Sequence, residues 1–245
     1  RYGHLSTGNY NPRTARLYTD LSYFTASEDL TADMDGVFNH LASQNRPPRL
    51  RQLLLAPFHL HQRLLEKIEQ VGQAAQAGQY ARIVAKMNAL TDEALVRALV
   101  RAGQQGARID LIVRGACILP AQQPGLTERI RVRSVIGRFL EHTRVFYFGA
   151  GEQEDLYLSS ADWMNRNMLR RVELAWPVTD PALRQRIIDE CLLAYLHDEQ
   201  GAWTQQPDGS YRPPARPLDG AGAQAALMAR YRRPAAAAPT QRRKA

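Results

Sequence analysis

One stretch of the sequence, residues 82 to 113, has the pattern of a strand, a helix and a second strand. An apolar run at 82 to 87 is followed by helical periodicity from about 92 to 104, and Gly106 precedes another β-rich run at 109 to 113. A helix that connects two strands of one sheet returns the chain to the end where it started, so the two strands run parallel. The pattern therefore predicts a mixed α/β domain.

Further segments supply the rest of the expected elements. Residues 17 to 24 alternate as a strand does, and Ser27 is a residue type that caps helix N-termini. The helix expected after it has apolar side chains on one face: Leu30, Met34, Val37, Phe38 and Leu41. We also expect strands near 52–55, 131–136, 143–148, 155–160 and 171–176, and helices near 59–75 and from Asp180-Pro181 onward.

The formal net charge of +8 favours an anionic partner such as nucleic acid, a phospholipid surface or a phosphate-rich substrate. Part of this charge lies in residues 230 to 245, which have no apolar periodicity and are predicted to be disordered. Arginines inside the predicted strands and helices are more informative, because a guanidinium binds phosphate oxygens in pairs. These are Arg13, Arg16, Arg114, Arg131, Arg133, Arg138, Arg144, Arg166, Arg170 and Arg171.

Several classes of protein are disfavoured by the composition. No apolar run approaches the roughly 18 residues that span a bilayer, and the first residues have no signal-peptide pattern, so we expect a cytosolic location. The two cysteines, Cys117 and Cys191, each lie in an apolar run. We therefore expect buried, reduced thiols rather than a disulfide or a zinc site.

Two segments of the chain are similar at a constant offset of 153 residues. Residues 5 to 10 (LSTGNY) align with residues 158 to 163 (LSSADW), and the same offset aligns further pairs: Arg13 with Arg166, Asp20 with Glu173, Leu21 with Leu174, and Tyr23 with Trp176. Chance similarity between two strand-turn-strand units is the alternative. The ungapped match of hydroxyl, acid or amide, aromatic and arginine favours an internal duplication.

His142 and Arg144 lie just before the second copy, at the start of a β-rich run. Alternation along a strand places both side chains on one face. Near the turn that carries Ser159, Ser160 and Asp162, they predict a phosphate pocket in which the imidazole transfers a proton or attacks phosphorus. A solvated strand edge is the alternative. The offset places the matching histidine of the first copy before Arg1, so we expect the chain to begin inside that copy.

A duplicated His-x-Lys or His-x-Arg followed by a small-residue turn resembles the phospholipase D superfamily. Within it, five stretches resemble polyphosphate kinases: residues 8–20 (GNYNPRTARLYTD), 111–115 (LIVRG), 130–134 (IRVRS), 139–144 (FLEHTR) and 157–164 (YLSSADWM). The resemblance implies an α/β fold with a phospholipase D-like mixed sheet flanked by helices. It divides the chain into the end of one such domain (1–45), a complete second one (46–228) and a disordered basic tail (229–245).

The resemblance implies an activity that moves the terminal phosphate of ATP reversibly to polyphosphate through a phosphohistidine, with Mg²⁺ accompanying ATP. It assigns ATP binding to Tyr18, Arg114 and His142 and a catalytic role to His142. Supporting roles are expected for Asn9, Arg144, Ser159, Ser160 and Asp162. The phosphorylated histidine and the metal site are expected upstream of Arg1, so the isolated chain should be inactive. The resemblance also implies a homo-oligomer without a nucleic-acid partner, in the cytoplasm or at the surface of the inner membrane.

Two other functions remain open at this point. A phospholipase D-like phosphodiesterase would require a lysine two residues after each histidine, and Arg144 stands in that position. A non-catalytic basic module that binds polyphosphate or nucleic acid is the second alternative. Four other histidines lack a repeated or family-matched context and are expected to be non-catalytic: His4, His59, His61 and His197.

Overall fold

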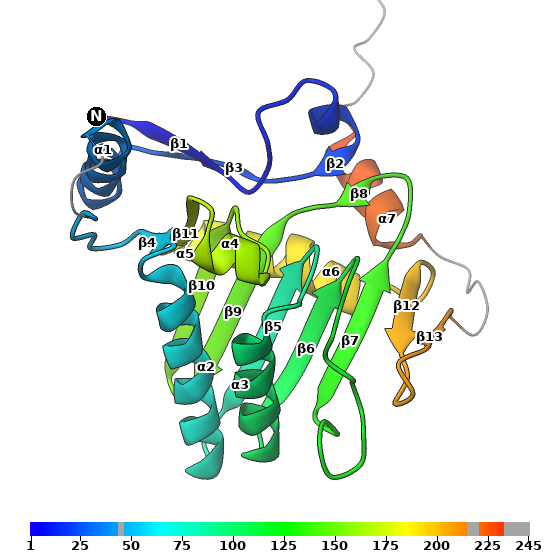
Figure 1. Cartoon of the computed structure of the whole chain (residues 1–245). Helices are drawn as coiled ribbons and strands as arrows, with labels where there is room; N and C mark the ends of the chain where they lie inside the picture. The colour runs from blue at the N-terminus through cyan, green and yellow to red at the C-terminus, as the bar shows by residue number, and fades with distance from the viewer. Residues whose placement is uncertain (44–46, 215–220, 233–245) are drawn as a thin grey trace, which may run out of the picture.

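The computed structural model describes residues 1–43, 47–214 and 221–232. Its centre is a nine-stranded mixed sheet in the order β13-β12-β7-β6-β5-β9-β10-β11-β4 (Figure 1). The strands are β4 (Leu54–Ala56), β5 (Ala81–Met87), β6 (Arg108–Val113), β7 (Ile130–Val135), β9 (Arg144–Ala150), β10 (Gln153–Ser159), β11 (Glu173–Pro177), β12 (Ala202–Gln205) and β13 (Tyr211–Arg212). The predicted mixed α/β class is confirmed.

The β5-α3-β6 unit has the predicted crossover, with β5 and β6 parallel. Helix α3 (Glu93–Gln104) begins after Asp92, whose carboxylate accepts the backbone N–H of Leu95 at 3.0 Å. Gly106 adopts φ +111° in the turn into β6, a backbone conformation that favours glycine. Strand β7 continues the parallel set beside β6, whereas β9 runs antiparallel to β5 on its other side. Because of these opposite directions, the carboxyl ends of β5 and β6 and the amino end of β9 lie at the same edge of the sheet.

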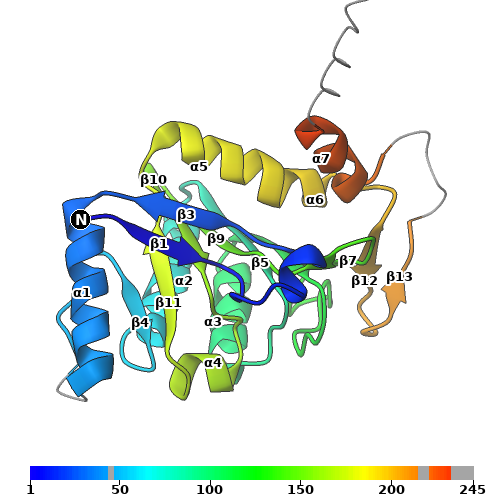
Figure 2. The same ribbon diagram turned by 90° about the horizontal axis from the view of Figure 1, so that it is seen from above.

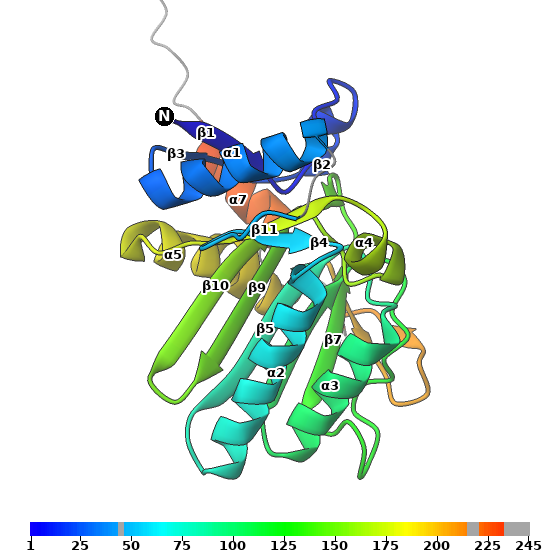
Figure 3. The ribbon, with the colours of Figure 1, turned by 60° about the vertical axis from the view of Figure 1, so that its left-hand side comes forward.

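The two faces of the sheet are covered by different helices. Helices α2 (Leu60–Gln76) and α3 pack on one face, where Ile83 and Ala85 of β5 contribute to the core (Figure 3). Val84 points to the opposite face, as alternation along a strand requires. That face is covered by a continuous helical run: α5 (Pro181–Ile187), a π-helical segment η2 (Ile188–Leu193) and α6 (Ala194–Leu196) (Figure 2). The described residues thus form two hydrophobic cores, one on each side of the sheet.

The N-terminal segment lies above the upper edge of this sheet (Figures 1 and 3). It contains β1 (Gly3–Ser6), the short helix η1 (Thr14–Arg16), β2 (Tyr18–Thr19), β3 (Ser22–Thr25) and α1 (Glu28–Ser43). Strands β1 and β3 form their own antiparallel pair, while β2 pairs in parallel with β8 (Leu140–Glu141). Residues 17 to 24, expected to form one strand, are therefore split between β2 and β3, which lie in two different sheets.

Other expectations need adjustment. On α1, Leu30 and Val37 are buried, but Phe38 and Leu41 are 66% and 48% exposed, so only part of the apolar face is covered. Cys191 is buried and Cys117 half-buried, and both are free thiols. Helix α7 (Ala223–Tyr231) continues past residue 228, so the predicted disordered tail does not begin at 229. The boundary between 45 and 46, and residues 233–245, lie outside the described residues.

The two similar segments have the same strand pairing. In the first copy Leu5 of β1 pairs with Tyr23 of β3. In the second copy Leu158 of β10 pairs with Trp176 of β11. Both members of the second pair lie 153 positions after those of the first, so the register of the two hairpins is identical.

The hydrogen bonds in the two turns also correspond. Thr7 donates from Oγ1 to Asp20 Oδ1 over 2.9 Å, and Ser160, at the matching position, donates to Glu173. Each hydroxyl also accepts the backbone N–H of the residue after the acid, from Leu21 at 3.0 Å and from Leu174 at 3.1 Å. The shared register and the shared side-chain contacts support the internal duplication over chance similarity.

No helix in residues 1–43, 47–214 and 221–232 is long and apolar enough to cross a membrane.

Candidate active site

Several predicted site residues and one further polar residue lie at the upper edge of the large sheet. Asn88 and Arg114 directly follow β5 and β6, and Arg144 is the first residue of β9. Because β9 is antiparallel to β5, its first residue lies at the same edge as the last residues of β5 and β6. The N-terminal segment lies over this edge (Figure 1). The candidate site is thus formed between the two copies.

His142 lies between β8 and β9 and is 8% exposed. Its Nδ1 is 3.0 Å from both carboxylate oxygens of Asp20, a residue of the first copy. A carboxylate only accepts hydrogen bonds, whereas Arg144 Nη1, 3.2 Å from Nδ1, only donates and is already used at 2.8 Å by the Thr7 carbonyl. Because both Asp20 oxygens lie closer to Nδ1, we assign the imidazole proton to Nδ1 and the lone pair to Nε2. Among the described residues, none forms a hydrogen bond with Nε2. This nitrogen is therefore available to a substrate oxygen.

Arg144 connects the second copy to the first. Its Nε and Nη2 donate to the two oxygens of Asp162 over 3.2 and 2.8 Å, and its Nη1 donates to the backbone carbonyl of Thr7 over 2.8 Å. Nη1 also lies 3.2 Å from His142 Nδ1. The adjacency expected from the His-x-Arg spacing is confirmed. Arg144 and Asp162 are both buried, at 6% and 4% exposed, so this arginine is fully engaged within the protein.

Asp162 is held as a carboxylate by its surroundings. Burial alone would raise its pKa, but the hydrogen bonds and charge of Arg144 and the backbone N–H groups of Asn88 and Ala89 lower the pKa below its usual value. These two N–H groups lie 2.7 and 3.2 Å from Asp162 Oδ1. The same carboxylate therefore fixes both the end of β5 and the start of β9.

Arg114 differs from Arg144 in having spare hydrogen-bonding capacity. Its Nη2 donates to the side-chain oxygen of Asn88, and its carbonyl accepts the Ser134 hydroxyl over 2.9 Å. The Nε atom is buried and has no hydrogen-bond partner among the described residues. The structure also shows no ion pair between Arg114 and an acidic side chain of the described residues. A buried donor without a partner is costly, and an anionic ligand would satisfy it.

Tyr18 lies directly beside His142. The two ring centroids are 4.8 Å apart with an angle of 51° between the planes. Pairing of β2 with β8 creates this contact, because Tyr18 is opposite Leu140 in the register. Tyr18 and Asp20 also line a cavity of about 460 Å³ that lies next to the site. Of the three residues expected to bind ATP, Tyr18 and His142 are in contact, and Arg114 is linked to them through Asn88, Asp162 and Arg144.

The remaining predicted residues have other roles or lie elsewhere. Ser159 Oγ donates to the Leu174 carbonyl over 2.9 Å, and Ser160 bonds Glu173, so both hydroxyls hold the turn. Asn9 is exposed, and its side chain takes part in none of the site's hydrogen bonds. The imidazole of His61 pairs with Asp92 at 3.0 Å and takes part in none of the site's hydrogen bonds.

Two site residues were not identified from the sequence. Asp20 was visible only as the acid that matches Glu173 in the duplication, and nothing local indicates that it contacts a histidine 122 positions away. Asn88 follows a buried strand at the active edge, which is a usual place for a functional side chain, but its link to Arg114 depends on the tertiary structure.

The described residues do not offer a ligand set for magnesium. Within the described part of the chain, no cluster of three or more histidine, cysteine or acidic side chains is placed to hold a metal ion. The two carboxylates at the site, Asp20 and Asp162, are already bonded to His142 and Arg144. Magnesium prefers several oxygen ligands in an octahedral arrangement, which these residues do not supply.

Comparisons with known proteins agree on one family. The model named "Polyphosphate kinase C-terminal domain 2" matches residues 53–224, and "Polyphosphate kinase C-terminal domain 1" matches residues 1–47. The chain is 52% identical over 212 residues to the polyphosphate kinase of Burkholderia cenocepacia, covering 86% of this chain and 31% of that protein. It is 48% identical over 231 residues to the enzyme of Paraburkholderia phytofirmans, covering 94% and 34%.

The crystal structure of polyphosphate kinase from Porphyromonas gingivalis superimposes with a TM-score of 0.88 at 35% identity, covering 94% of this chain and 35% of that one. The chain therefore spans about a third of the length of the curated relatives it matches. The matched family model covers well over half of the chain. This chain belongs to the polyphosphate kinase family.

Proposed function

We propose that this chain forms part of the active site of a polyphosphate kinase, in which the terminal phosphate of ATP moves reversibly to polyphosphate. The observation that carries the proposal is the hydrogen bonding of the His142 imidazole. Asp20 holds its Nδ1, while Nε2 has no protein partner among the described residues. A buried imidazole fixed in this way is ready to exchange a proton with a substrate oxygen.

The arginines have separate roles in this proposal. Phosphoryl transfer depends mainly on positioning and on neutralising the charge that spreads over the phosphate oxygens. Among the described residues, Arg114 has a buried donor without a hydrogen-bond partner and forms no ion pair, so we assign the phosphate contact to it. Arg144 is bonded to Asp162 and Thr7, so we assign it to holding His142 in place. Tyr18 contacts the nucleotide from beside His142.

The phosphate-accepting nucleophile is proposed to lie in the first copy, outside the sequence of this chain. Magnesium is proposed to arrive with ATP and to neutralise phosphate charge there. Because the described residues do not fit a resident magnesium site, no step is assigned to the metal. A cytoplasmic location follows from the proposed use of ATP.

A phosphodiesterase of the phospholipase D type is less well supported. That chemistry needs a basic residue free to bind phosphate two positions after the histidine. Arg144 occupies the position, but its guanidinium is buried against Asp162.

The test compares this chain with a protein of the relatives' length that contains it, called the full-length protein below. With ATP and magnesium, the full-length protein should make polyphosphate and the 245-residue chain should make none. A full-length protein that binds polyphosphate without turning over ATP would instead support the basic binding module. Acid-labile phosphate on the isolated chain would contradict the placement of the nucleophile.

A further inference from the structure

A buried carboxylate, Glu141, immediately precedes His142 and is 2% exposed. Four elements direct a hydrogen-bond donor at it. The donors are Lys86 Nζ of β5 at 2.7 Å, Thr19 Oγ1 of β2 at 2.8 Å, the Tyr195 hydroxyl of α6 at 3.0 Å and Gln224 Nε2 of α7 at 2.5 Å. Glu141 is thus the point where the two copies and the C-terminal helices meet.

The charge of Glu141 is balanced inside the protein. Lys86 is also 2% exposed, and its ammonium lies 3.7 Å from the centre of the Tyr195 ring. Burial would raise the pKa of Glu141, but the charge of Lys86 and the hydrogen bonds from Lys86, Gln224 and Thr19 lower the pKa below its usual value. Removing one partner of a buried ion pair leaves the charge of the other without compensation. The pairing of Lys86 with Glu141 therefore favours one arrangement of the cluster.

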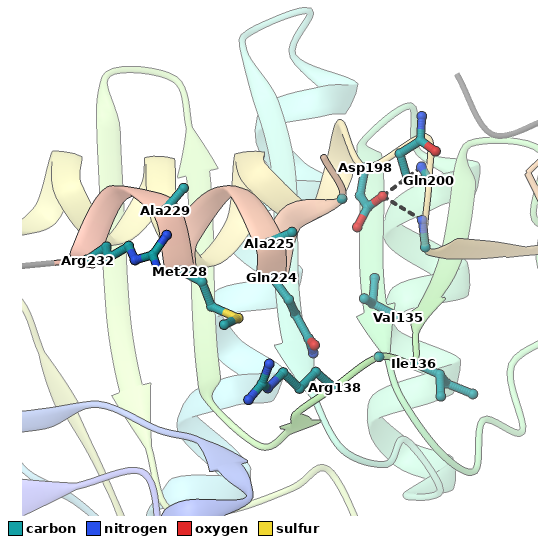
Figure 4. A pocket seen from close by; sticks show the side chains of 13 residues that line it. Val135, Ile136, Arg138, Asp198, Gln200, Gln224, Ala225, Met228, Ala229 and Arg232 are labelled. Atoms are coloured by element: carbon teal, nitrogen blue, oxygen red, sulfur yellow. Dashed lines mark hydrogen bonds between the residues drawn. The ribbon is translucent and has the colours of Figure 1, made fainter. Parts of the chain in front are cut away.

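Gln224 is the member of this cluster that comes from the C-terminal helix. Its Oε1 accepts the backbone N–H of Phe139 at 3.0 Å, and its Nε2 donates to the Phe139 carbonyl at 2.8 Å as well as to Glu141. One side chain therefore binds both ends of the short segment before His142. Gln224 also lines two cavities, of about 720 and 460 Å³. Figure 4 shows it pointing from α7 toward the segment that carries Arg138.

Helix α7 is itself fixed to the domain. Asp198 Oδ2 accepts the backbone N–H of Ala223 at 2.8 Å, at the start of the helix. Its Oδ1 accepts those of Gln200 and Gly201 at 2.8 and 2.7 Å (Figure 4). The hydrogen bonds of Asp198 thus fix the start of α7, and with it the position from which Gln224 contacts residues 139–141.

A continuous path of hydrogen bonds connects Gln224 to His142. Gln224 bonds Glu141, Glu141 accepts the hydroxyl of Thr19, and that hydroxyl accepts the backbone N–H of His142 at 3.3 Å. On the other side of His142, the hydroxyl of Thr143 donates to the Thr19 carbonyl at 3.0 Å. We infer that Gln224 is a positioning residue, which acts through Glu141 and Thr19 to hold His142 at the substrate phosphate. This inference rests on the proposed function for its catalytic consequence only.

The sharpest test is Gln224→Glu, which keeps the shape but loses both donated hydrogen bonds and places a second carboxylate against Glu141. On the 245-residue chain, amide hydrogen exchange in residues 139–143 should accelerate about 10-fold or more, while α2 and α3 stay protected. In the full-length protein, kcat should fall by about 10- to 100-fold, more than KM for ATP changes, because a small displacement of His142 impairs chemistry.

Two further variants keep the test decisive. Gln224→Met removes the hydrogen bonds without adding charge and should show the same faster exchange if Gln224→Glu fails to fold. The matched control is Gln73→Glu on α2, where Gln73 is exposed and bonds Glu69. It should leave exchange and kcat unchanged.

Unchanged exchange at 139–143 and unchanged kcat in folded Gln224→Glu and Gln224→Met would overturn the inference. Accelerated exchange across the whole chain would also overturn it, since Gln224 would then support the fold in general. The exchange measurement requires no activity. A full-length wild-type protein without polyphosphate synthesis would therefore contradict the proposed function while leaving the positioning of residues 139–143 testable.

Discussion

Asp20 and His142 are 122 positions apart in the chain, yet both carboxylate oxygens of Asp20 lie 3.0 Å from His142 Nδ1. The acid comes from the first copy and the histidine from the second. Thr7 holds the acid in turn, donating to its Oδ1 over 2.9 Å. The orientation of the imidazole is therefore determined by contacts between the copies.

Replacing Asp20 tests this relationship. Asp20→Asn can present either a donor or an acceptor to Nδ1, so the imidazole loses its fixed tautomer and kcat of the full-length protein should fall by about 100-fold. Nitrogen NMR of the 245-residue chain should show the Nδ1–H form in the wild type and a mixture in the variant. Asp35→Asn, at an exposed aspartate paired with Arg1, is the control. Equal tautomer populations in wild type and Asp20→Asn would contradict the assignment.

His142→Ala separates catalysis from folding. In the full-length protein, kcat should fall by about 10²- to 10⁴-fold, the usual effect of losing a positioned acid or base. The circular dichroism spectrum should be unchanged, because His142 bridges elements that Thr19, Glu141 and Arg144 also connect. His61→Ala, which removes a histidine paired with Asp92, should be near neutral for activity. A folded His142→Ala protein with wild-type turnover would remove His142 from the mechanism.

Arg114→Lys should impair the full-length enzyme although it keeps the charge. An ammonium has no Nε in the position of the buried, unpartnered guanidinium donor and cannot form a paired contact with phosphate oxygens. We expect kcat/KM for ATP to fall by about 10- to 100-fold, which corresponds to roughly 1.4–2.7 kcal/mol. Arg97→Lys, at an exposed arginine on α3 paired with Glu93, is the matched control. Equal kcat/KM for Arg114→Lys and Arg97→Lys would show that the paired N–H donors of the Arg114 guanidinium do not contribute to activity.

Local patterns predicted much of the fold. The β5-α3-β6 crossover follows from apolar periodicity over neighbouring residues. The contact of His142 with Arg144 agrees with their spacing of two residues, although His142 itself lies between β8 and β9. The exposure of Phe38 on α1 could not be predicted in this way, since its periodicity shows a face but not what covers it.

The contacts of single polar residues were harder to predict. In the sequence Lys86 lies within an apolar run that predicts a strand, and only the tertiary structure shows its pairing with Glu141. Asp20 and Asn88 reach the site through pairing between distant strands. The duplication was the one sequence signal that marked Asp20, because it aligned this acid with Glu173.

The folded arginines should bind polyphosphate even in the isolated chain. Binding should be weak and should fall steeply as salt rises, as expected when counterions are released from a polyanion. Titration of labelled polyphosphate at several salt concentrations measures the slope, and the truncated chain 1–232 shows how much of the binding depends on residues 233–245. If all binding disappears with residues 233–245, the arginines of the folded domain do not form an anion site.

Acid unfolding should reveal two buried carboxylates whose pKa values are lowered. The folded-state pKa values of Asp162 and Glu141 are lowered, so the stabilisation they provide is fully present above the unfolded values of about 4 and is lost as pH falls through the folded values. Urea unfolding of the chain should therefore show a steep fall in stability below about pH 4.

Asp162→Asn provides the specific test of that fall. At neutral pH it should destabilise the chain by about 3–5 kcal/mol, because Arg144 is left buried without its carboxylate. Its stability should then depend less on pH below about 4 than that of the wild type, since one of the groups with a lowered pKa is gone. Asp208→Asn is the control, because Asp208 also has a lowered pKa but lies in an exposed turn where it bonds Ser210. Parallel stability curves for wild type and Asp162→Asn would show that the Arg144 pair is not the origin of the acid sensitivity.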